Sequence, residues 1–332
     1  MTEHRASTVP QNAVVVGVDG TDRDRAVVEW AARSALRRGV GLHAVHAQET
    51  MATAYAPVGF GMDAPLLTQA GDEVDEGAEV RQHVEDILAS LDRAPELTFS
   101  APWNTGSQAL LEAEEHAQLI VVGTARKHGL TRFLLGSTSL TVAMHARCPV
   151  IVVGPEGVPP EKGLLVVGVD GSRDSTKALR FAMHAASNWG QRVRAVTTWN
   201  MAVVNGYVVT EPDSQEWKDI VADLEKSVQA QVDQVRADEP ALADVQVEVT
   251  ALHGRPVTAL TEASAEADLV VVGSRGRGGV AGALLGSVSQ GVLAEAHCPV
   301  AIIPAGEDAS RAGGDAAVVV GVDGSEQGRA AA

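Results

Sequence analysis

The sequence contains little cysteine, few aromatic residues and no long apolar segment. Two cysteines among 332 residues argue against a disulfide framework and favour a reducing compartment. Aromatic residues make up only 3% of the chain while hydrophobic residues make up 45%, so we expect aliphatic cores. No apolar run approaches the roughly 18 residues of a membrane span, and the N-terminal residues lack the apolar segment of a signal peptide. We therefore expect a cytoplasmic protein without a membrane partner.

Positive charge is also scarce. The chain has 26 Lys and Arg against 43 Asp and Glu, which gives a formal net charge of −17. A field of this sign repels nucleic acid and anionic lipid, so we expect neither as a partner. Any phosphate group must then be bound locally, by backbone amides and a few arginines.

The chain consists of two similar halves. Residues 14–21 (VVVGVDGT) recur 151 positions later as residues 165–172 (LVVGVDGS). Three further strings recur 150 positions apart: LIVVG at 119–123 as LVVVG at 269–273, LLGS at 134–137 and 284–287, and CPV at 148–150 and 298–300. The near-constant offset indicates a duplicated domain rather than a short solenoid repeat.

Each half is expected to alternate strands and helices. Short Val-rich runs bounded by glycine predict strands, and longer amphipathic stretches predict helices. In the first half we expect strands at 13–18, 41–46, 97–101, 119–122 and 149–153, and helices at 22–38, 72–93, 106–117 and 137–146. The second half repeats this order from 164 to 303. The alternation implies parallel βαβ units and hence an α/β fold.

The expected domain organisation follows from these elements. We expect a flexible N-terminus (1–11), a first repeat (12–154), a linker rich in Pro and Gly (155–163), a second repeat (164–304) and a tail (305–332). Within the tail, residues 318–325 (VVVGVDGS) copy the first strand a third time. A lone strand cannot fold by itself, so this segment is a truncated third repeat, a relic, or a strand that docks on a sheet edge.

The stretch 269–289 has the pattern of an anion site. A Val-rich strand ends in Gly273, a glycine-rich loop follows, and a second apolar segment opens after Gly286. The spacing is G-x2-G-x9-G-S, with Gly276 as the second glycine and Ser287 as the last residue, which we expect to be the N-cap of a helix. Strand, glycine loop and helix N-terminus together direct backbone N–H groups toward an anion.

Taken together and twice over, these motifs resemble the universal stress protein family, and in particular its tandem two-domain members. The resemblance covers residues 12–154 and 163–304. It implies two tandem doubly wound domains, Rossmann-like and similar to the adenine nucleotide α-hydrolase group. Each would hold a five-stranded parallel sheet in order 3-2-1-4-5. It also implies ATP, with Mg, bound through G-x2-G-x9-G-(S/T).

Family members commonly pair strand five with its counterpart in another domain, which hides an exposed sheet edge. The resemblance therefore implies an intramolecular pseudo-dimer of the two repeats. A homodimer of whole chains stays open.

The second repeat fits the family motif completely. Its first strand ends at Asp170 and its fourth at Gly273, so both face the place where the strand order reverses. By resemblance, Asp170 contacts the adenosine end, and the glycines let the backbone approach ribose and phosphates. The arginines of the loop either add charge to the phosphates or are solvated. The nucleotide-binding residues implied for this repeat are Asp170, Thr198, Gly273, Arg275, Gly276, Arg277, Gly286, Ser287, Val288 and Ser289.

The first repeat departs from the motif at one position. Arg126 stands where the second glycine belongs, and there it either obstructs the backbone or grips phosphate together with Lys127. The other motif positions are retained, and the corresponding set is Asp19, Gly123, Arg126, Gly136, Ser137, Thr138 and Ser139. We expect this repeat to bind ATP more weakly than the second.

Other chemistries find little support. No Walker A string occurs, and His43 and His46 lie three apart on a strand and face opposite sides, which disfavours a metal site. Cys148 and Cys298, each before a proline, are expected to be small buried residues. No catalytic triad or positioned general base can be assembled from the motifs.

The sequence therefore predicts an ATP-binding stress-response regulator with at most slow hydrolysis. Two alternatives remain open. An ATP-hydrolysing or nucleotidyl-transferring enzyme would turn over with Mg²⁺, and its activity would fall when Asp170 is changed. A nucleotide-free scaffold or regulatory partner would purify empty and show no thermal shift with ATP.

Overall fold

A computed structural model describes residues 9–48, 76–124, 136–154, 161–200, 203–204, 207–208, 211–212, 214–276 and 285–305. The loop residues 125–135 and 277–284 and the tail beyond 305 lie outside this part of the chain, so the predictions about Arg126, Arg277 and the third copy of the first strand do so as well. No helix in the described part is long and apolar enough to cross a membrane.

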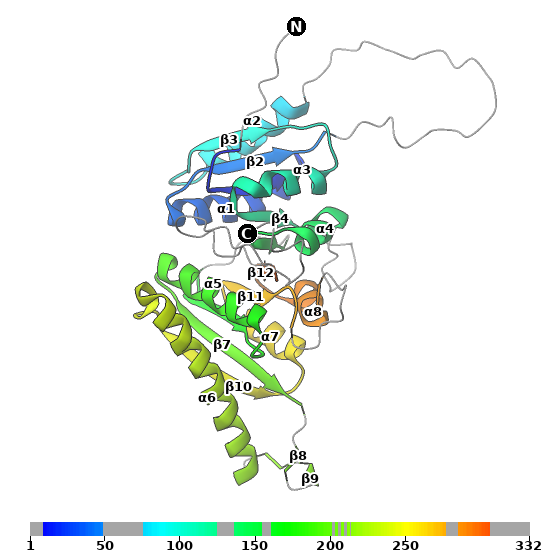
Figure 1. Ribbon diagram of the computed structural model, residues 1–332. Helices are drawn as coiled ribbons and strands as arrows, with labels where there is room; N and C mark the ends of the chain where they lie inside the picture. Colours follow the sequence, from blue (N-terminus) through cyan, green and yellow to red (C-terminus); the bar gives the residue numbers. More distant parts are fainter. Residues whose placement is uncertain are drawn as a thin grey trace, which may run out of the picture.

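The described residues of the first repeat form five strands and four α-helices. Figure 1 shows that strands and helices alternate along the chain. In chain order they are β1 (Ala13–Val18), α1 (Asp24–Arg38), β2 (Leu42–His46), α2 (Glu76–Ala89), β3 (Leu97–Ser100), α3 (Gly106–Ala113), β4 (Ala117–Gly123), α4 (Ser137–His145) and β5 (Val150–Val153). A 3₁₀ turn, η2 (Glu114–His116), joins α3 to β4.

The second repeat has the same order. Its elements are β6 (Leu164–Gly168), α5 (Arg173–Trp189), β7 (Arg192–Trp199), α6 (Gln215–Asp238), β10 (Val247–His253), α7 (Pro256–Ser264), β11 (Leu269–Gly273), α8 (Ser287–Glu295) and β12 (Val300–Ile303). A 3₁₀ turn, η3 (Pro240–Leu242), follows α6. A small hairpin between β7 and α6, formed by β8 (Val203–Val204) and β9 (Tyr207–Val208), was not expected from the sequence.

In the described part of the chain, every strand outside the hairpin belongs to one ten-stranded sheet, in the order β10-β7-β6-β11-β12-β5-β4-β1-β2-β3. Within each repeat the pairs are parallel and the order is 3-2-1-4-5, which confirms the predicted doubly wound fold. The repeats join through β5 and β12, which pair antiparallel with Ile151 opposite Ala301. The predicted association of the two fifth strands is thus present within one chain.

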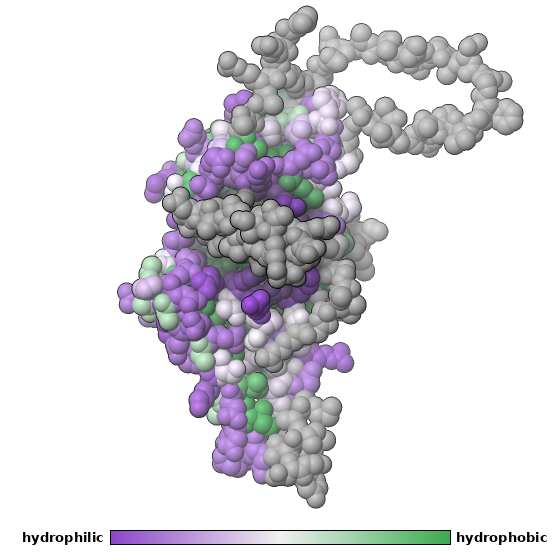
Figure 2. All heavy atoms as spheres, viewed as in Figure 1, coloured by the Kyte–Doolittle hydropathy of each residue, from purple (hydrophilic) through white to green (hydrophobic). Residues whose placement is uncertain are grey.

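The sheet is covered on both faces, which explains why its six central strands, β6, β11, β12, β5, β4 and β1, are almost entirely apolar. One core cluster combines residues of α1, α2, α5 and α6 with one face of the strands, and the other combines α3, α4, α7 and α8 with the opposite face. Both clusters include residues of both repeats, so the core is continuous across the junction. The outer surface seen in Figure 2 is mostly hydrophilic, as the acidic composition predicts.

Several element boundaries differ from the sequence prediction. Helix α1 begins at Asp24 rather than residue 22, because residues 19–21 form a turn in which the Asp19 carboxylate accepts hydrogen bonds from Thr21. It ends as expected before Gly39, which has φ 67°. Helix α3 ends at Ala113 rather than residue 117, because Ala117 already pairs with Ala13 in the sheet. Helix α2 ends at Ala89 rather than residue 93, and residues 72–75 lie outside the described part.

Helices α1 and α5 pack across the junction at equivalent positions of the two repeats. Trp30 of α1 lies edge-on to Trp189 of α5, with ring centroids 5.8 Å apart. Their counterparts 151 residues away are Phe181 and Arg38, and the Arg38 guanidinium lies 5.7 Å from the Phe181 ring centroid. The same two helix positions therefore form an aromatic pair on one side and a cation–π pair on the other. A cavity lies beside the aromatic pair, lined among others by Trp30, Trp189 and Gln191.

Truncating the aromatic side chain to alanine should destabilise the protein more in the Trp30–Trp189 pair than in the Phe181–Arg38 pair. Trp30 is 5% exposed, so Trp30→Ala should lower the unfolding free energy by about 3–5 kcal/mol. Phe181→Ala, the matched change at the equivalent and only partly buried position, should cost less than half as much. Urea unfolding of both variants measures the difference, and an equal loss in the two would contradict this account of the junction.

Candidate functional site

The candidate site lies where the strand order of the second repeat reverses. Strand β6 pairs with β7 on one side and β11 on the other, so the connections after β6 and β11 leave toward opposite faces of the sheet. The loop after β6 contains Asp170, and β11 ends at Gly273. We call Asp170, Gly273, Gly276, Gly286 and Ser287 the second-repeat site.

Gly276 and Asp170 are brought into direct contact. A Cβ atom added at Gly276 would lie 2.5 Å from the Asp170 Oδ2 atom, which is far inside contact distance. The other carboxylate oxygen of Asp170 accepts a hydrogen bond from the backbone N–H of Ser172, at 2.9 Å. A side chain at position 276 would therefore displace the Asp170 carboxylate from its present place.

Gly273 allows a second close approach. A Cβ atom there would lie 3.1 Å from the carbonyl oxygens of both Asp174 and Arg275. Asp174 belongs to the first turn of α5, so this glycine lets the start of α5 pack against the end of β11. The start of α5 is therefore one wall of the second-repeat site.

The start of α8 is connected to the same strand end. The Gly286 N–H donates to the carbonyl of Ser274 at 2.7 Å, and the Ser289 hydroxyl, 3% exposed, donates to the carbonyl of Gly273 at 2.7 Å. The three motif glycines, Asp170 and the first turn of α8 thus meet at the carboxyl edge of β6 and β11, as the spacing predicted.

The N-cap prediction was wrong by one residue. The N-cap of α8 is Gly286, in an extended conformation with no side-chain hydrogen bond, and Ser287 is the first helical residue. Because glycine has no side chain, nothing at the N-cap competes for the N–H groups of the first turn. Those of Ser287, Val288 and Ser289 are therefore available to an anion.

The remaining predicted residues are less closely associated. Arg275 is exposed in the loop after β11, and Thr198 is half-buried near the end of β7, where it pairs with Leu252 of β10. Neither has a hydrogen bond within the described residues that ties it to the glycines.

The first repeat contains the same framework. Gly136 is the N-cap of α4 with an extended backbone, Ser137 is exposed, and the buried Ser139 hydroxyl donates to the carbonyl of Gly123. Thr138 lies against the start of α3, where a Cβ at Gly106 would be 3.3 Å away. The Asp19 carboxylate accepts from the backbone N–H and hydroxyl of Thr21.

A buried carboxylate, Asp24, distinguishes the first repeat and was missed by the sequence analysis. It is 4% exposed and accepts from the backbone N–H groups of Gly20 at 2.8 Å and Asp19 at 3.2 Å. The pKa of Asp24 is raised to about 6, mainly by burial and also by the nearby Asp19 carboxylate, whereas the two amides and the charge of His83 oppose the rise. The counterpart 151 residues later is Ser175, so aligning the repeats reveals the difference as Asp against Ser.

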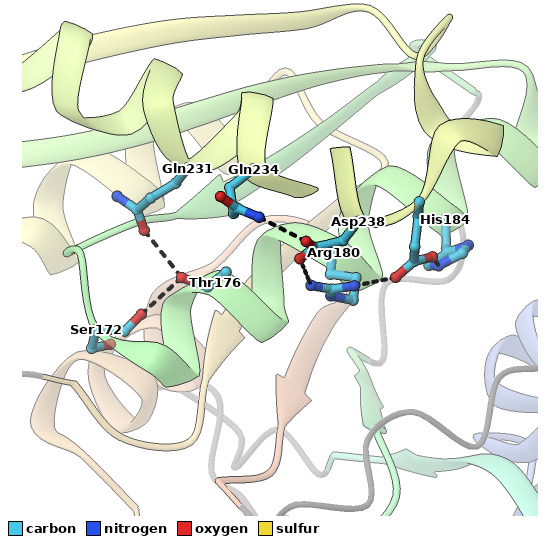
Figure 3. A network of polar contacts seen from close by, with 8 residues as sticks. Ser172, Thr176, Arg180, His184, Gln231, Gln234 and Asp238 are labelled. Carbon is cyan, nitrogen blue, oxygen red and sulfur yellow. Dashed lines mark hydrogen bonds and ion pairs between the residues drawn. The ribbon is translucent and has the colours of Figure 1, made fainter. Parts of the chain in front are cut away.

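A polar network fixes the wall formed by α5 (Figure 3). Ser172, Thr176, Arg180 and His184 follow one face of α5 at intervals of four residues. Thr176 lies 3.2 Å from the side-chain oxygen of Gln231 on α6. Arg180 donates to Asp238 and Glu239, and His184 contacts Glu239. Because Ser172 caps α5 through the N–H of Ser175, these contacts hold the helix start in place.

Three rings gather beside this edge, at the ends of β7 and β10. Trp199 lies 4.6 Å from Trp217 and 4.7 Å from His253 between ring centroids, and Trp217 lies 4.8 Å from His253. This aromatic cluster packs the beginning of α6 on the sheet. Its members are far apart in sequence, so no local pattern predicts it.

The cysteines and strand histidines take no part in the site. Both cysteines are free, and burial raises the pKa of each thiol to about 12, which keeps Cys148 and Cys298 protonated. His43 is fully buried between Thr98 and Ser100, and burial lowers its pKa to about 4. Within the described residues, no group of three or more His, Cys, Asp or Glu is placed to hold a metal ion.

Comparisons with known proteins agree with the two repeats. The model of the universal stress protein family matches residues 12–154 and again residues 164–304. A universal stress protein of Mycobacterium tuberculosis is 32% identical over 302 residues, which cover 88% of this chain and 97% of the relative. The crystal structure of a universal stress protein from Archaeoglobus fulgidus shares the fold, with a TM-score of 0.57, 19% identity, and coverage of 89% of this chain and 99% of that one. A universal stress protein crystallised in complex with cAMP is 28% identical, with a TM-score of 0.33, and covers 42% of this chain and 95% of its own.

The buried Asp24 carboxylate predicts a specific dependence of stability on pH. Its pKa is about 6 in the folded protein, against an ordinary value of 3.8 for an aspartate, so its favourable contribution is complete below about pH 4 and is lost as pH rises through 6. Asp24→Asn keeps an acceptor oxygen for Gly20 and removes the charge, so it should raise the unfolding free energy at pH 7.5 by about 1–3 kcal/mol. The gain should vanish at pH 4.

Urea unfolding at the two pH values checks this. Asp22→Asn, at an exposed position two residues earlier, is the matched control and should show no such difference. His43 titrates in wild type and variant alike and cancels from the comparison. A loss of stability for Asp24→Asn at pH 7.5 would contradict the prediction.

Proposed function

This chain belongs to the universal stress protein family, and we propose that its second repeat binds ATP and that the chain acts as a nucleotide-sensing regulator of the stress response in the cytoplasm. The observation that carries the proposal is the contact between Gly276 and the Asp170 carboxylate. It brings an acceptor group and a glycine-containing backbone turn to the same edge as the N-terminus of α8.

The two ends of this arrangement have complementary chemistry. The Asp170 carboxylate accepts hydrogen bonds, which suits the hydroxyl and amino donors of an adenosine. The first-turn N–H groups of α8 donate hydrogen bonds and carry the positive end of the helix dipole, which suits phosphate oxygens. A nucleotide presents these two kinds of group at opposite ends. In this acidic chain, backbone amides provide the phosphate contacts that the overall charge does not favour.

The residues present fit ATP as the bound group. Asp170 would hold the nucleoside, Gly273 and Gly276 would leave room for it, and Ser287 with the amides of Val288 and Ser289 would hold the phosphates, with Mg²⁺ neutralising their charge. Arg275 and Arg277 remain proposals for additional phosphate contacts.

The residues around the three motif glycines favour ATP binding without rapid hydrolysis. Among the described residues, the groups nearest to positions 273, 276 and 286 belong to Asp170, Asp174, Ser274, Arg275 and Ser289, and none of these is a His or Glu. The carboxylate of Asp170 already accepts a hydrogen bond from the Ser172 N–H. We therefore propose at most slow hydrolysis.

Glycine substitutions test the binding site. Gly276→Ala should push the Asp170 carboxylate aside and weaken ATP binding at least tenfold, without a large change in folding. Gly286→Ala should be tolerated, because a Cβ there has its nearest neighbour at 3.4 Å, whereas Gly286→Val should abolish binding by covering the first-turn amides. Isothermal titration with ATP, ADP and cAMP measures each affinity.

The same titration decides between this proposal and a nucleotide-free scaffold. Wild-type protein should release an adenine nucleotide when denatured, identifiable by mass spectrometry, or should bind added ATP. Empty protein that shows no heat with millimolar ATP would overturn the proposal, and so would an unchanged affinity in Gly286→Val.

A turnover assay separates the sensor from the enzyme. With Mg²⁺ the wild-type chain should hydrolyse less than roughly one ATP per minute, against 1–10³ per second for typical enzymes. Faster release of phosphate that disappears in Asp170→Asn would show that the chain is an enzyme.

A further inference from the structure

The loops after the first strands of the two repeats differ at one buried position. In both loops, the aspartate is followed by a glycine whose backbone is left-handed, with φ 81° for Gly20 and 80° for Gly171. In both, the aspartate accepts a hydrogen bond from the N–H two residues later, at 3.0 Å for Asp19 and 2.9 Å for Asp170. The loops therefore have the same shape, and the difference lies in what fills them.

In the first repeat a carboxylate fills the loop. Asp24 accepts from the N–H groups of Asp19 and Gly20 and is almost completely buried. In the second repeat the residue at this place is Ser175, whose hydroxyl donates to the carbonyl of Ser172 at 2.9 Å. The N–H of Gly171 then has no acceptor among the described residues.

We propose that Asp24 closes the first repeat to nucleotides, so that the chain binds a single nucleotide, in its second repeat. This inference rests on the proposed function. At pH 8 the Asp24 carboxylate is an anion that accepts hydrogen bonds from the loop amides of its own repeat, whereas the equivalent residue of the second repeat, Ser175, is uncharged.

The surrounding charges support closure. Asp24 lies beside Asp19, so two carboxylates meet at the end of β1, whereas the second carboxylate near the equivalent loop of the second repeat, Asp174, pairs with Lys177. The described cationic groups nearby are Arg23, which is exposed, Arg25, which pairs with Glu29, and His83 of α2, which contacts the carbonyl of Thr21 and whose charge lowers the pKa of Asp24. A polyphosphate entering here would bring further negative charge against two carboxylates at close range.

The position of Asp24 matches the wall of the second-repeat site. Ser175 is the neighbour of Asp174, whose carbonyl lies against Gly273. The start of α1 occupies the same place beside β4, where a Cβ at Gly123 would lie 2.9 Å from Val27. Asp24 is therefore built into the wall that a nucleotide would have to contact.

A reciprocal exchange tests the inference. ATP is titrated at pH 8 by calorimetry into wild type, Asp24→Ser and Ser175→Asp, with circular dichroism as the check on folding. Wild type should bind one equivalent, Asp24→Ser should bind two, and Ser175→Asp should lose at least tenfold in affinity. Arg126 is unchanged in every protein, so a second equivalent in Asp24→Ser cannot arise from that residue.

The inference stands only if both variants behave in this way. Two equal sites in wild type, one equivalent in Asp24→Ser, or an affinity within threefold of wild type in Ser175→Asp would each overturn it. If Asp24→Ser fails to fold, Asp24→Asn takes its place, because it removes the charge and keeps the shape.

Failure of the proposed function gives a different result. If wild type binds no ATP at all, ATP binding by the second repeat is wrong, and Asp24→Ser alone then decides the inference. One equivalent gained by that variant upholds closure of the first repeat, and none overturns it.

Discussion

The pairing of β5 with β12 is the interaction on which the rest of the structure depends. Each repeat alone would end in a bare strand edge with unpaired N–H and C=O groups, which favours uncontrolled association. The antiparallel pairing of residues 150–152 with 300–302 satisfies these groups and merges two five-stranded sheets into one. It also places α1 against α5, so that two hydrophobic cores become continuous. The duplicated sequence is therefore one folding unit in space.

Within each repeat, close backbone packing matters more than any single side chain. Strand β11, the start of α5 and the start of α8 approach one another through Gly273, Gly276 and Gly286, where added Cβ atoms would meet backbone or a carboxylate. The hydroxyl of Ser289 connects α8 to the strand end. A site built in this way is formed before a ligand arrives, which lowers the entropy cost of binding.

The sequence predicted the fold because its signals are repeated and local. Val-rich runs, glycine punctuation and two copies with a constant offset define the strands and their order, and the glycine spacing brings the motif residues together. Asp24 could not be assigned, because an acidic residue in the first turn of a helix usually faces solvent and favours the dipole. Only packing shows that its carboxylate turns inward. The choice between Gly286 and Ser287 as N-cap likewise depends on backbone geometry, since both residues are favourable there. The contact of Trp30 with Trp189 could not be predicted from local sequence, because it forms only when the two repeats pack together.

The antiparallel pairing of the two repeats determines where the carboxyl ends of their strands lie relative to each other. Because β5 and β12 run in opposite directions, the carboxyl ends of the first repeat's strands point one way along the sheet and those of the second repeat point the other. The candidate sites of the two repeats therefore lie at opposite ends of the strands. If the second repeat binds a nucleotide as proposed, that nucleotide is held at one end of the sheet's strands, and the first repeat presents its Asp24-filled loop at the opposite end.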